Sequence, residues 1–208
     1  MPRKLFSLAY FPPISYWIAL RHDGANAIDL SENYQKQSYR SRASIADPDG
    51  KKNLIVPILH RSGERLKTAQ APLSYAENWP LIHWRTLEAS YRSSPYFEYY
   101  EDSLKALFEQ RFDTLADLCL ASCAWVAEEL EMELEWEELT EYRAAGPKEI
   151  DFRDRIHPKK PTLLRAEEYH QVFGDRHGFL EDLSILDLLF IKGPAAYAFL
   201  LQGELRDA

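Results

Sequence analysis

The sequence has few of the residues that mark several common protein classes. It contains 2 cysteines and 8 glycines in 208 residues. Two cysteines are too few for a disulfide framework, and so few glycines argue against a nucleotide fold built on a glycine-rich loop. No apolar run approaches the roughly 20 residues that a membrane-spanning helix needs. Hydrophobic residues make up 46% and charged residues 28%, a composition typical of a folded globular chain.

Charge is distributed unevenly along the chain, whose formal net charge is -8. Residues 1–67 carry 11 Lys/Arg against 6 Asp/Glu, whereas residues 68–145 carry 5 against 16. The basic first third suggests an anionic ligand held near the N-terminal part, and a solvated acidic helical face explains the middle equally well. The sequence pI of about 5.3 argues against nucleic acid as a partner, because phosphate-dominated binding normally shows a basic domain.

The hydrophobic pattern of the first third predicts strands around a helix. Leu5–Phe11 and Ala27–Leu30 are short apolar segments, and residues 14–22 between them show helical spacing, which is typical of a parallel strand–helix–strand unit. The turn at 47–50 predicts a hairpin over 40–59. We therefore expect an α/β fold, in which a short mixed or parallel sheet from the N-terminal third packs against several helices from the middle and C-terminal parts.

Helical signals dominate after residue 78. Asn78 can cap a helix with proline in its first turn, and Ser94-Pro95 can begin another. A third helix is expected from about 114 to 131. Ser184-Ile-Leu-Asp187 has the spacing of a capping box ahead of the final helices. Residues 132–162 look irregular.

The chain shows no internal boundary strong enough to divide it. We expect a single domain over residues 1–208, with an α/β part at 1–75 and a helical part at 76–208. The N-terminus imitates a secretion signal, but Pro12-Pro13 interrupts its apolar stretch. We therefore interpret it as folded structure of a cytoplasmic protein.

A polar stretch over residues 32–42 is the strongest candidate for ligand binding. Amide and guanidinium groups offer directed hydrogen-bond donors, and guanidinium binds carboxylate or phosphate through two bonds at once. An exposed polar loop with incidental charge is the alternative interpretation. The candidate binding residues of this stretch are Glu32, Asn33, Gln35, Lys36, Arg40 and Arg42.

His83 is the candidate catalytic residue. On the predicted helix it shares a face with Thr86 and Ser90, opposite the apolar stripe. Histidine titrates near neutrality and can act as a general base or acid. A solvated surface histidine is the alternative.

Other reactive residue types have simpler explanations. Cys119 and Cys123 lie one helical turn apart on a predicted apolar face, which favours buried packing over catalysis or metal binding. Asp187 is explained by helix capping, with catalysis as the weaker reading. Carboxylates and histidines do not cluster at ligand spacing, so we expect no metal and no cofactor.

Several segments together resemble one known family, the WbqC-like protein family. The similarity runs from about residue 8 to residue 200, and Ser41 departs from it where asparagine is expected. The segments that carry it include Tyr10–Tyr16, Glu32–Arg40, His83–Thr86, Ser94–Tyr100, Ile156–Lys160 and Gln171–Phe173.

The resemblance implies a bacterial protein with relatives linked to O-antigen and other surface-polysaccharide assembly. It implies a transferase that acts on sugars and attaches an amino-acid or acyl group. Separately, the basic first third leads us to expect an anionic activated donor, such as a nucleotide sugar or an acyl or aminoacyl donor. The expected partners are that small-molecule donor and a sugar acceptor, without membrane insertion. The sequence leaves the oligomeric state open.

The polar stretch and the matched segments give the expected site. Donor phosphates would be neutralised by Lys36, Arg40 and Arg42. Sugar hydroxyls would be bound by Glu32, Asn33 and Gln35, and His83 would remove a proton from the acceptor. Further substrate contacts are expected from Tyr10, Arg85 and Tyr96. The alternative function is a non-catalytic glycan- or protein-binding module.

Overall fold

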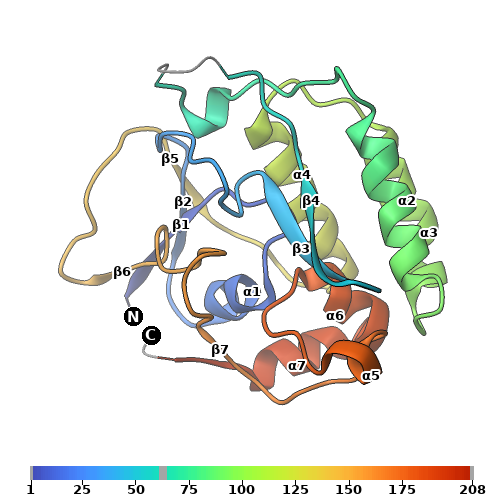
Figure 1. Ribbon diagram of the computed structural model, residues 1–208. Helices are drawn as coiled ribbons and strands as arrows, with labels where there is room; N and C mark the ends of the chain where they lie inside the picture. The colour runs from blue at the N-terminus through green and yellow to red at the C-terminus, as the bar shows by residue number, and fades with distance from the viewer. Residues whose placement is uncertain (1, 61–64, 207–208) are drawn as a thin grey trace.

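The computed structural model describes residues 2–60 and 65–206 of the chain. Figure 1 shows the strands of a sheet on one side of the molecule, a hairpin across its middle and long helices on the other side. The strands are β1 (Arg3–Ser7), β2 (Asn26–Asp29), β3 (Arg42–Asp47), β4 (Gly50–Ile55), β5 (Glu137–Leu139), β6 (Glu149–Asp151), β7 (Leu164–Arg165) and β8 (Glu204–Leu205). The helices are α1 (Ile14–Arg21), η1 (Thr68–Gln70), α2 (Trp79–Tyr91), α3 (Phe97–Glu109), α4 (Leu115–Glu129), α5 (Gly174–His177), α6 (Ile185–Lys192), η2 (Gly193–Ala195) and α7 (Ala196–Gln202).

A parallel sheet in the order β5-β2-β1-β6 confirms the expected α/β fold. Strand β1 is central, with Leu5 opposite Ala27 of β2 on one side and Asp151 of β6 on the other. The α1 crossover joins β1 to β2, as the apolar pattern of the first third predicts. Strand β1 ends at Ser7 rather than at Phe11, because the following residues leave the sheet and enter the core.

The interpretation of residues 132–162 as irregular is wrong in part. Two short edge strands lie there, β5 paired with β2 and β6 paired with β1. Their sequences, Glu-Glu-Leu and Glu-Ile-Asp, carry acidic rather than alternating apolar residues. Such strands form because the exposed backbone of the inner strands accepts them, and side-chain patterning gives no signal of this.

The hairpin and the central helices follow their local signals. Strands β3 and β4 pair antiparallel through the Asp47–Gly50 turn, and Gly50 has the positive φ of +111° that favours glycine. The Asn78 side chain caps α2 as expected. Helix α3 begins at Phe97, two residues after the predicted proline start.

Only one half of the capping box predicted at Ser184–Asp187 forms. Ser184 caps α6 by accepting from the Leu186 amide. The Asp187 carboxylate turns instead into the core, where it accepts hydrogen bonds from the hydroxyls of Tyr91 (2.7 Å) and Tyr169 (2.5 Å). Neutral hydroxyl donors from the end of α2 and from the loop after β7 therefore replace the backbone amide as the partners of this buried acid.

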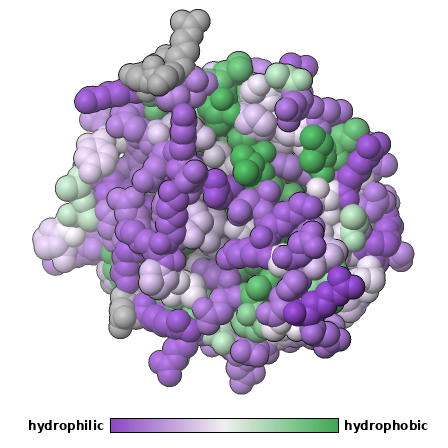
Figure 2. Space-filling model, in the orientation of Figure 1, coloured by the Kyte–Doolittle hydropathy of each residue, from purple (hydrophilic) through white to green (hydrophobic). Residues whose placement is uncertain are grey.

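One main hydrophobic cluster joins the sheet, the hairpin and the helices. Residues 14–20 of α1 are all buried, because α1 packs against α6, α7 and β8. Helix α3 contacts α2, α4 and α6, and both cysteines lie buried on α4 as expected. The face in Figure 2 is mostly hydrophilic, with hydrophobic residues in separate small patches.

Among the described residues, the helical stretch 185–202 is long and apolar enough to cross a membrane by length and composition alone. It comprises α6, η2 and α7, and 56% of it is buried inside the structure. Because buried core helices meet the same criterion, the stretch gives little support to a membrane span.

Candidate functional site

The sheet brings the ends of β1 and β6 together at its carboxyl edge. The chain leaves β1 through α1 to reach β2 on one side, whereas β6 lies on the other side of β1. In open parallel sheets, ligands bind outside the carboxyl ends of the strands, at the point where the order of the strands reverses. The residues that follow β1 and β6 are therefore the place to look for a site.

Three adjoining hollows follow this edge, and we call them together the polar groove. They share lining residues, because Tyr39 and Ile156 line both the first and the second, and Arg40 lines both the second and the third. Their volumes are about 190, 10 and 380 Å³. The first lies between α1, β4 and residues 155–163, and the third lies beside residues 31–35.

The polar groove is rich in positive charge although the whole chain is acidic. Six Lys/Arg side chains and one histidine line it, against four Asp/Glu. The basic residues are Arg40, Lys51, Lys67, Arg153, Arg155, His157 and Lys160. The acidic residues are Glu32, Asp154, Glu181 and Asp182. Arg40 is paired with Glu32, and Arg153 is paired with Asp29 and Asp151, so the lysines of the groove carry the positive charge that can attract an anion to this edge.

Arg40 lies at the centre of the polar groove and is buried. Its guanidinium donates to Glu32 (2.7 Å), to the Ser7 hydroxyl (2.9 Å) and to the Gln35 side-chain oxygen (3.1 Å). Burial raises the pKa of Glu32, and the charge of Arg40 opposes that rise. The Nε of Arg40 and the Oε2 of Glu32 are buried and have no hydrogen-bond partner among the described residues, so each is an unsatisfied polar group of the interior.

A second buried ion pair supports the groove from below. Arg153, two residues after β6, donates to Asp29 at the end of β2 (2.6 Å) and to Asp151 (2.6 Å). Asp29 is fully buried and also accepts from the amide and hydroxyl of Ser31. These contacts fix the two strand ends on either side of β1, and with them the position of the groove walls.

A proline turn shapes one wall of the groove. His157, Pro158, Lys159 and Lys160 form a β-turn in which the Lys160 amide donates to the His157 carbonyl (3.0 Å), with proline at the position that favours it. His157 and Lys160 line the first hollow, and Lys159 does not. Burial is the main cause that lowers the pKa of His157, and the charges of Arg40 and Lys160 lower it further.

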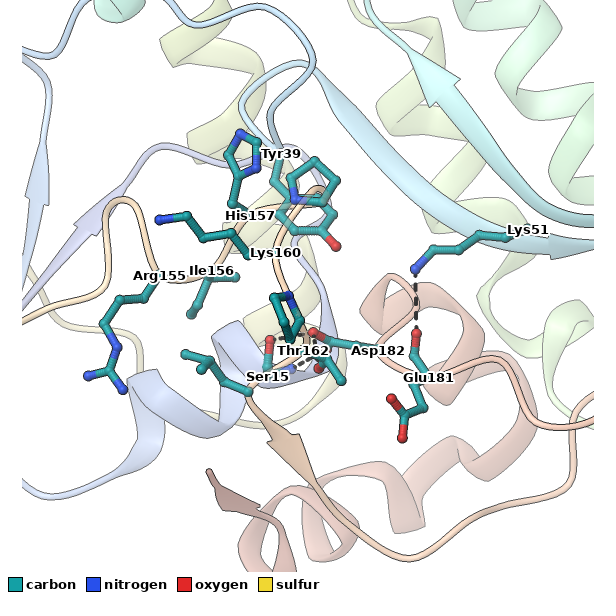
Figure 3. Close-up of a pocket in the computed structure, with 13 residues that line it drawn as sticks. Ser15, Tyr39, Lys51, Arg155, Ile156, His157, Lys160, Thr162, Glu181 and Asp182 are labelled. Carbon is teal, nitrogen blue, oxygen red and sulfur yellow. Dashed lines mark hydrogen bonds between the residues drawn. The ribbon is translucent and has the colours of Figure 1, made fainter. Parts of the chain in front are cut away.

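The floor of the first hollow holds a buried carboxylate. Asp182 accepts from the Ser15 amide, the Ser15 hydroxyl and the Thr162 hydroxyl, each at 2.8 Å. Figure 3 shows these three residues together beneath the hollow, with Lys51 reaching toward Glu181 beside them. Burial raises the pKa of Asp182, and its hydrogen bonds oppose that rise. Asp182 thus already supplies an anion to the first turn of α1.

His83 and Tyr10 meet each other in the core, away from the polar groove. The Nδ1 of His83 lies 3.1 Å from the Tyr10 hydroxyl and its Nε2 lies 3.1 Å from the Ile55 carbonyl oxygen. The expectation that the His83 face points away from the apolar side of α2 is wrong, since both His83 and Ser90 are buried. Burial lowers the pKa of His83 to about 4.

The structure brings part of the predicted binding set together. Four of its members line the polar groove, namely Glu32, Asn33, Gln35 and Arg40. Lys36, Arg42, Arg85 and Tyr96 are not among the lining residues of the three hollows. Arg85 is exposed on α2, and the Tyr96 ring covers Gly193 at the end of α6.

Sequence reasoning missed His157, Lys160 and Asp182 as groove residues. His157 and Lys160 belong to a matched segment, and the sequence His-Pro-Lys-Lys signals a turn that carries three groups able to be cationic. That signal was available. Asp182 has no such signal, because its place opposite Ser15 depends on a contact across 167 positions of the chain. Among the described residues, no group of three or more His, Cys, Asp or Glu side chains could hold a metal ion.

The fold and the groove define an α/β protein with a cation-rich site at the carboxyl edge of a parallel sheet. The family model described as the WbqC-like protein family matches residues 9–160, and the chain belongs to this family. The matched range includes the basic residues of the groove and leaves out Thr162, Glu181 and Asp182. No curated protein and no solved structure was found to match the chain.

Proposed function

We propose that this protein is a cytoplasmic transferase of bacterial surface-polysaccharide assembly, and that its polar groove binds an anionic activated donor. Membership of the WbqC-like family supports the biological setting. The observation that carries the proposal is the groove lined by cationic side chains, which lies where the strand order of a parallel sheet reverses. A nucleotide sugar or an acyl or aminoacyl donor carries the negative charge that such a groove attracts.

The third hollow suits the polar part of such a donor. It is lined by the carboxylate of Glu32 and the amides of Asn33 and Gln35, which hydrogen-bond hydroxyl groups well. Tyr34 and Tyr142 add ring surfaces at the same hollow. Because Arg40 and Glu32 are already held in place, the bound donor meets groups that need little reorganisation.

The test is a thermal-shift panel of nucleotide sugars, coenzyme A thioesters and aminoacyl donors, followed by a turnover assay with the donor that binds. A ligand at about 100 times its dissociation constant stabilises the folded state by roughly 2.7 kcal/mol. We expect at least one donor class to raise the melting temperature and to be consumed when a sugar acceptor is added. If no donor class binds, the transferase proposal fails.

A non-catalytic binding module is the second candidate, favoured by the state of the acid and base groups. His83 has protein partners at both ring nitrogens, Asp182 accepts three hydrogen bonds, and Glu32 is paired with Arg40. Groups whose hydrogen-bonding positions are occupied by protein partners are not placed to exchange a proton with a substrate. Saturable binding of a glycan or a donor without any turnover would favour this module over the transferase.

A further inference from the structure

The His157–Lys160 turn lines the first hollow, at the end of the polar groove away from the third hollow. Ile156, the residue before it, lines the first and second hollows, and Arg40 lines the second and third. In Figure 3, His157, Lys160 and Arg155 lie on one side of the first hollow, and Lys51 lies on the opposite side. A group bound beside the turn therefore lies in the hollow of about 190 Å³, and the second hollow of about 10 Å³ separates it from the third hollow of about 380 Å³.

We propose that the His157–Lys160 turn binds a phosphate group of the donor in the first hollow, with the charge of Arg40 adding to the attraction, and that the polar remainder of the donor extends along the polar groove toward the third hollow. This inference rests on the proposed function and makes it more specific. The sequence predicts that Lys36, Arg40 and Arg42 bind the donor phosphates. In this proposal the turn takes the place of Lys36 and Arg42, and Arg40 keeps its part. The ligand class is a phosphate ester, whether it is part of a nucleotide sugar or of the phosphopantetheine arm of an acyl donor.

Two side-chain hydrogen-bond donors of the turn, on His157 and Lys160, are not used in contacts with the described part of the protein. The His157 Nδ1 accepts from the Lys159 amide at 3.2 Å, so the neutral ring carries its proton on Nε2. Among the described residues, neither that Nε2 nor the Lys160 ammonium has a side-chain or backbone partner. Both residues line the first hollow, so a phosphate bound there can accept from each group without breaking an existing hydrogen bond, and charge-assisted bonds of this kind are the strong ones.

The charges around His157 also favour an anion. Three positive groups act on the ring, Arg40, Lys160 and Lys159, and Asp154 is the acidic group that opposes them. Arg155, Lys51, Tyr39, Glu181 and Asp182 are the other titratable side chains that line the same hollow. Because burial and the positive neighbours together hold the ring neutral, a bound phosphate would reverse part of that effect.

Asp182 decides which end of the first hollow takes the phosphate. Its carboxylate faces the first turn of α1 through the Ser15 amide, so a second anion at that floor would be repelled. The volume points the same way, because about 190 Å³ is below the roughly 300–1,000 Å³ of pockets that enclose a whole drug-sized ligand. The first hollow thus takes one small group, and the larger part of the donor lies elsewhere.

Calorimetry on the full chain tests the assignment, with inorganic pyrophosphate, a nucleotide sugar and coenzyme A as three probes. Lys160→Gln should weaken pyrophosphate binding about tenfold or more, the effect of losing one charge-assisted hydrogen bond. Lys159→Gln is the matched control, since it removes the same charge from the next residue, outside the hollow. It should stay within about twofold of the parent. Equal losses in both variants would reduce the effect to general electrostatics and overturn the assignment.

A titration of His157 by NMR provides a readout that a structural role would not change. Saturating pyrophosphate should raise the pKa of His157, and His157→Gln should weaken binding while leaving the melting temperature nearly unchanged. An unmoved pKa overturns the inference. A nucleotide sugar or coenzyme A that binds the parent and Lys160→Gln equally also overturns the inference but leaves the proposed function standing. Failure of every donor class to bind removes the proposed function itself.

Discussion

At the scale of single residues, burial sets the protonation state of His83. The ring lies between the Tyr10 hydroxyl and the Ile55 carbonyl and is 3% exposed. The neutral ring satisfies both partners, whereas the imidazolium form would carry an uncompensated charge in the core, and its pKa is accordingly lowered to about 4. A role of His83 as general base stays a prediction, and it would require the ring to reach a substrate past Tyr10.

The lowered pKa of His83 predicts a specific loss of stability in acid. The unfolded chain protonates this histidine near pH 6.5 and the folded protein only near pH 4. The contribution is therefore complete above pH 6.5 and is lost as the pH falls toward 4, amounting to about 3 kcal/mol. His83→Gln keeps a hydrogen-bonding side chain that does not titrate in this range, so its unfolding free energy should lack this component.

Urea denaturation of both proteins between pH 7.5 and pH 4 measures the difference. The stability advantage of the parent over His83→Gln should shrink by about 3 kcal/mol across that range. Other acidic and basic groups change the stability of both proteins alike, so the difference isolates His83. A constant difference over the whole range would contradict a buried neutral ring.

At the scale of elements, the end of α6 depends on a glycine. Gly193 has a positive φ of +52°, and a Cβ there would lie 2.4 Å from Cδ1 of the Tyr96 ring. The Tyr96 amide also donates to the Phe190 carbonyl of α6 at 3.0 Å. Tyr96 therefore packs the start of α3 against the end of α6. These contacts explain the position of the Tyr96 side chain without a ligand.

Gly193→Ala should destabilise the protein by about 2 kcal/mol or more. Alanine is strained at this positive φ, and its Cβ would also displace the Tyr96 ring. Gly174→Ala is the matched control, because nothing lies within 4 Å of a Cβ at that position and its φ is not positive. Thermal unfolding of the two variants should show a clear drop for the first and little change for the second. Equal drops would contradict the packing of Tyr96 over Gly193.

A buried carboxylate also joins elements that are distant in sequence. Asp187 of α6 accepts from Tyr91 at the end of α2 and from Tyr169 in the C-terminal segment. The Tyr91 hydroxyl in turn accepts from the Ala46 amide of β3 at 2.9 Å. This chain of hydrogen bonds ties the hairpin to the helices in an interior where each bond is strengthened by the low dielectric constant.

At the scale of the whole molecule, one core spans the α/β part and the helical part. The main hydrophobic cluster contains Phe6 of β1, Trp17 of α1 and Ile45 of β3 together with Leu104 of α3 and Leu188 of α6. A shared core makes partial unfolding costly, because separating the parts would expose apolar surface on both sides.

We therefore expect unfolding in a single cooperative transition. Tryptophan fluorescence reports on α1, α2, α4 and the residue directly before β5, Trp136, whereas far-ultraviolet circular dichroism reports on the whole backbone. The two signals should give coincident midpoints in urea. Two separated transitions would show that residues 1–75 and 76–208 unfold independently, and the expectation of a single domain would then fail.

The sequence was a good guide to elements with strong local signals and a poor one to those without. Asn78 with its proline, and the Asp47–Gly50 turn, are recognisable because their chemistry is local. Strands β5 and β6 carry no such pattern, since neighbouring backbone rather than side-chain alternation creates them. The same distinction applies to the site, where Glu32, Asn33, Gln35 and Arg40 come from one short segment and Asp182 does not.

By itself, the sequence determined the α/β class, the family and a polar segment rich in hydrogen-bonding groups. Those properties follow from periodicity, turn chemistry and motifs, which are read within a few consecutive residues. The tertiary structure alone decided that His83 is buried against Tyr10 and that the His157–Lys160 turn faces the same groove as Arg40. Burial and electrostatic potential depend on what packs around a side chain, and here those neighbours come from segments far apart in the chain.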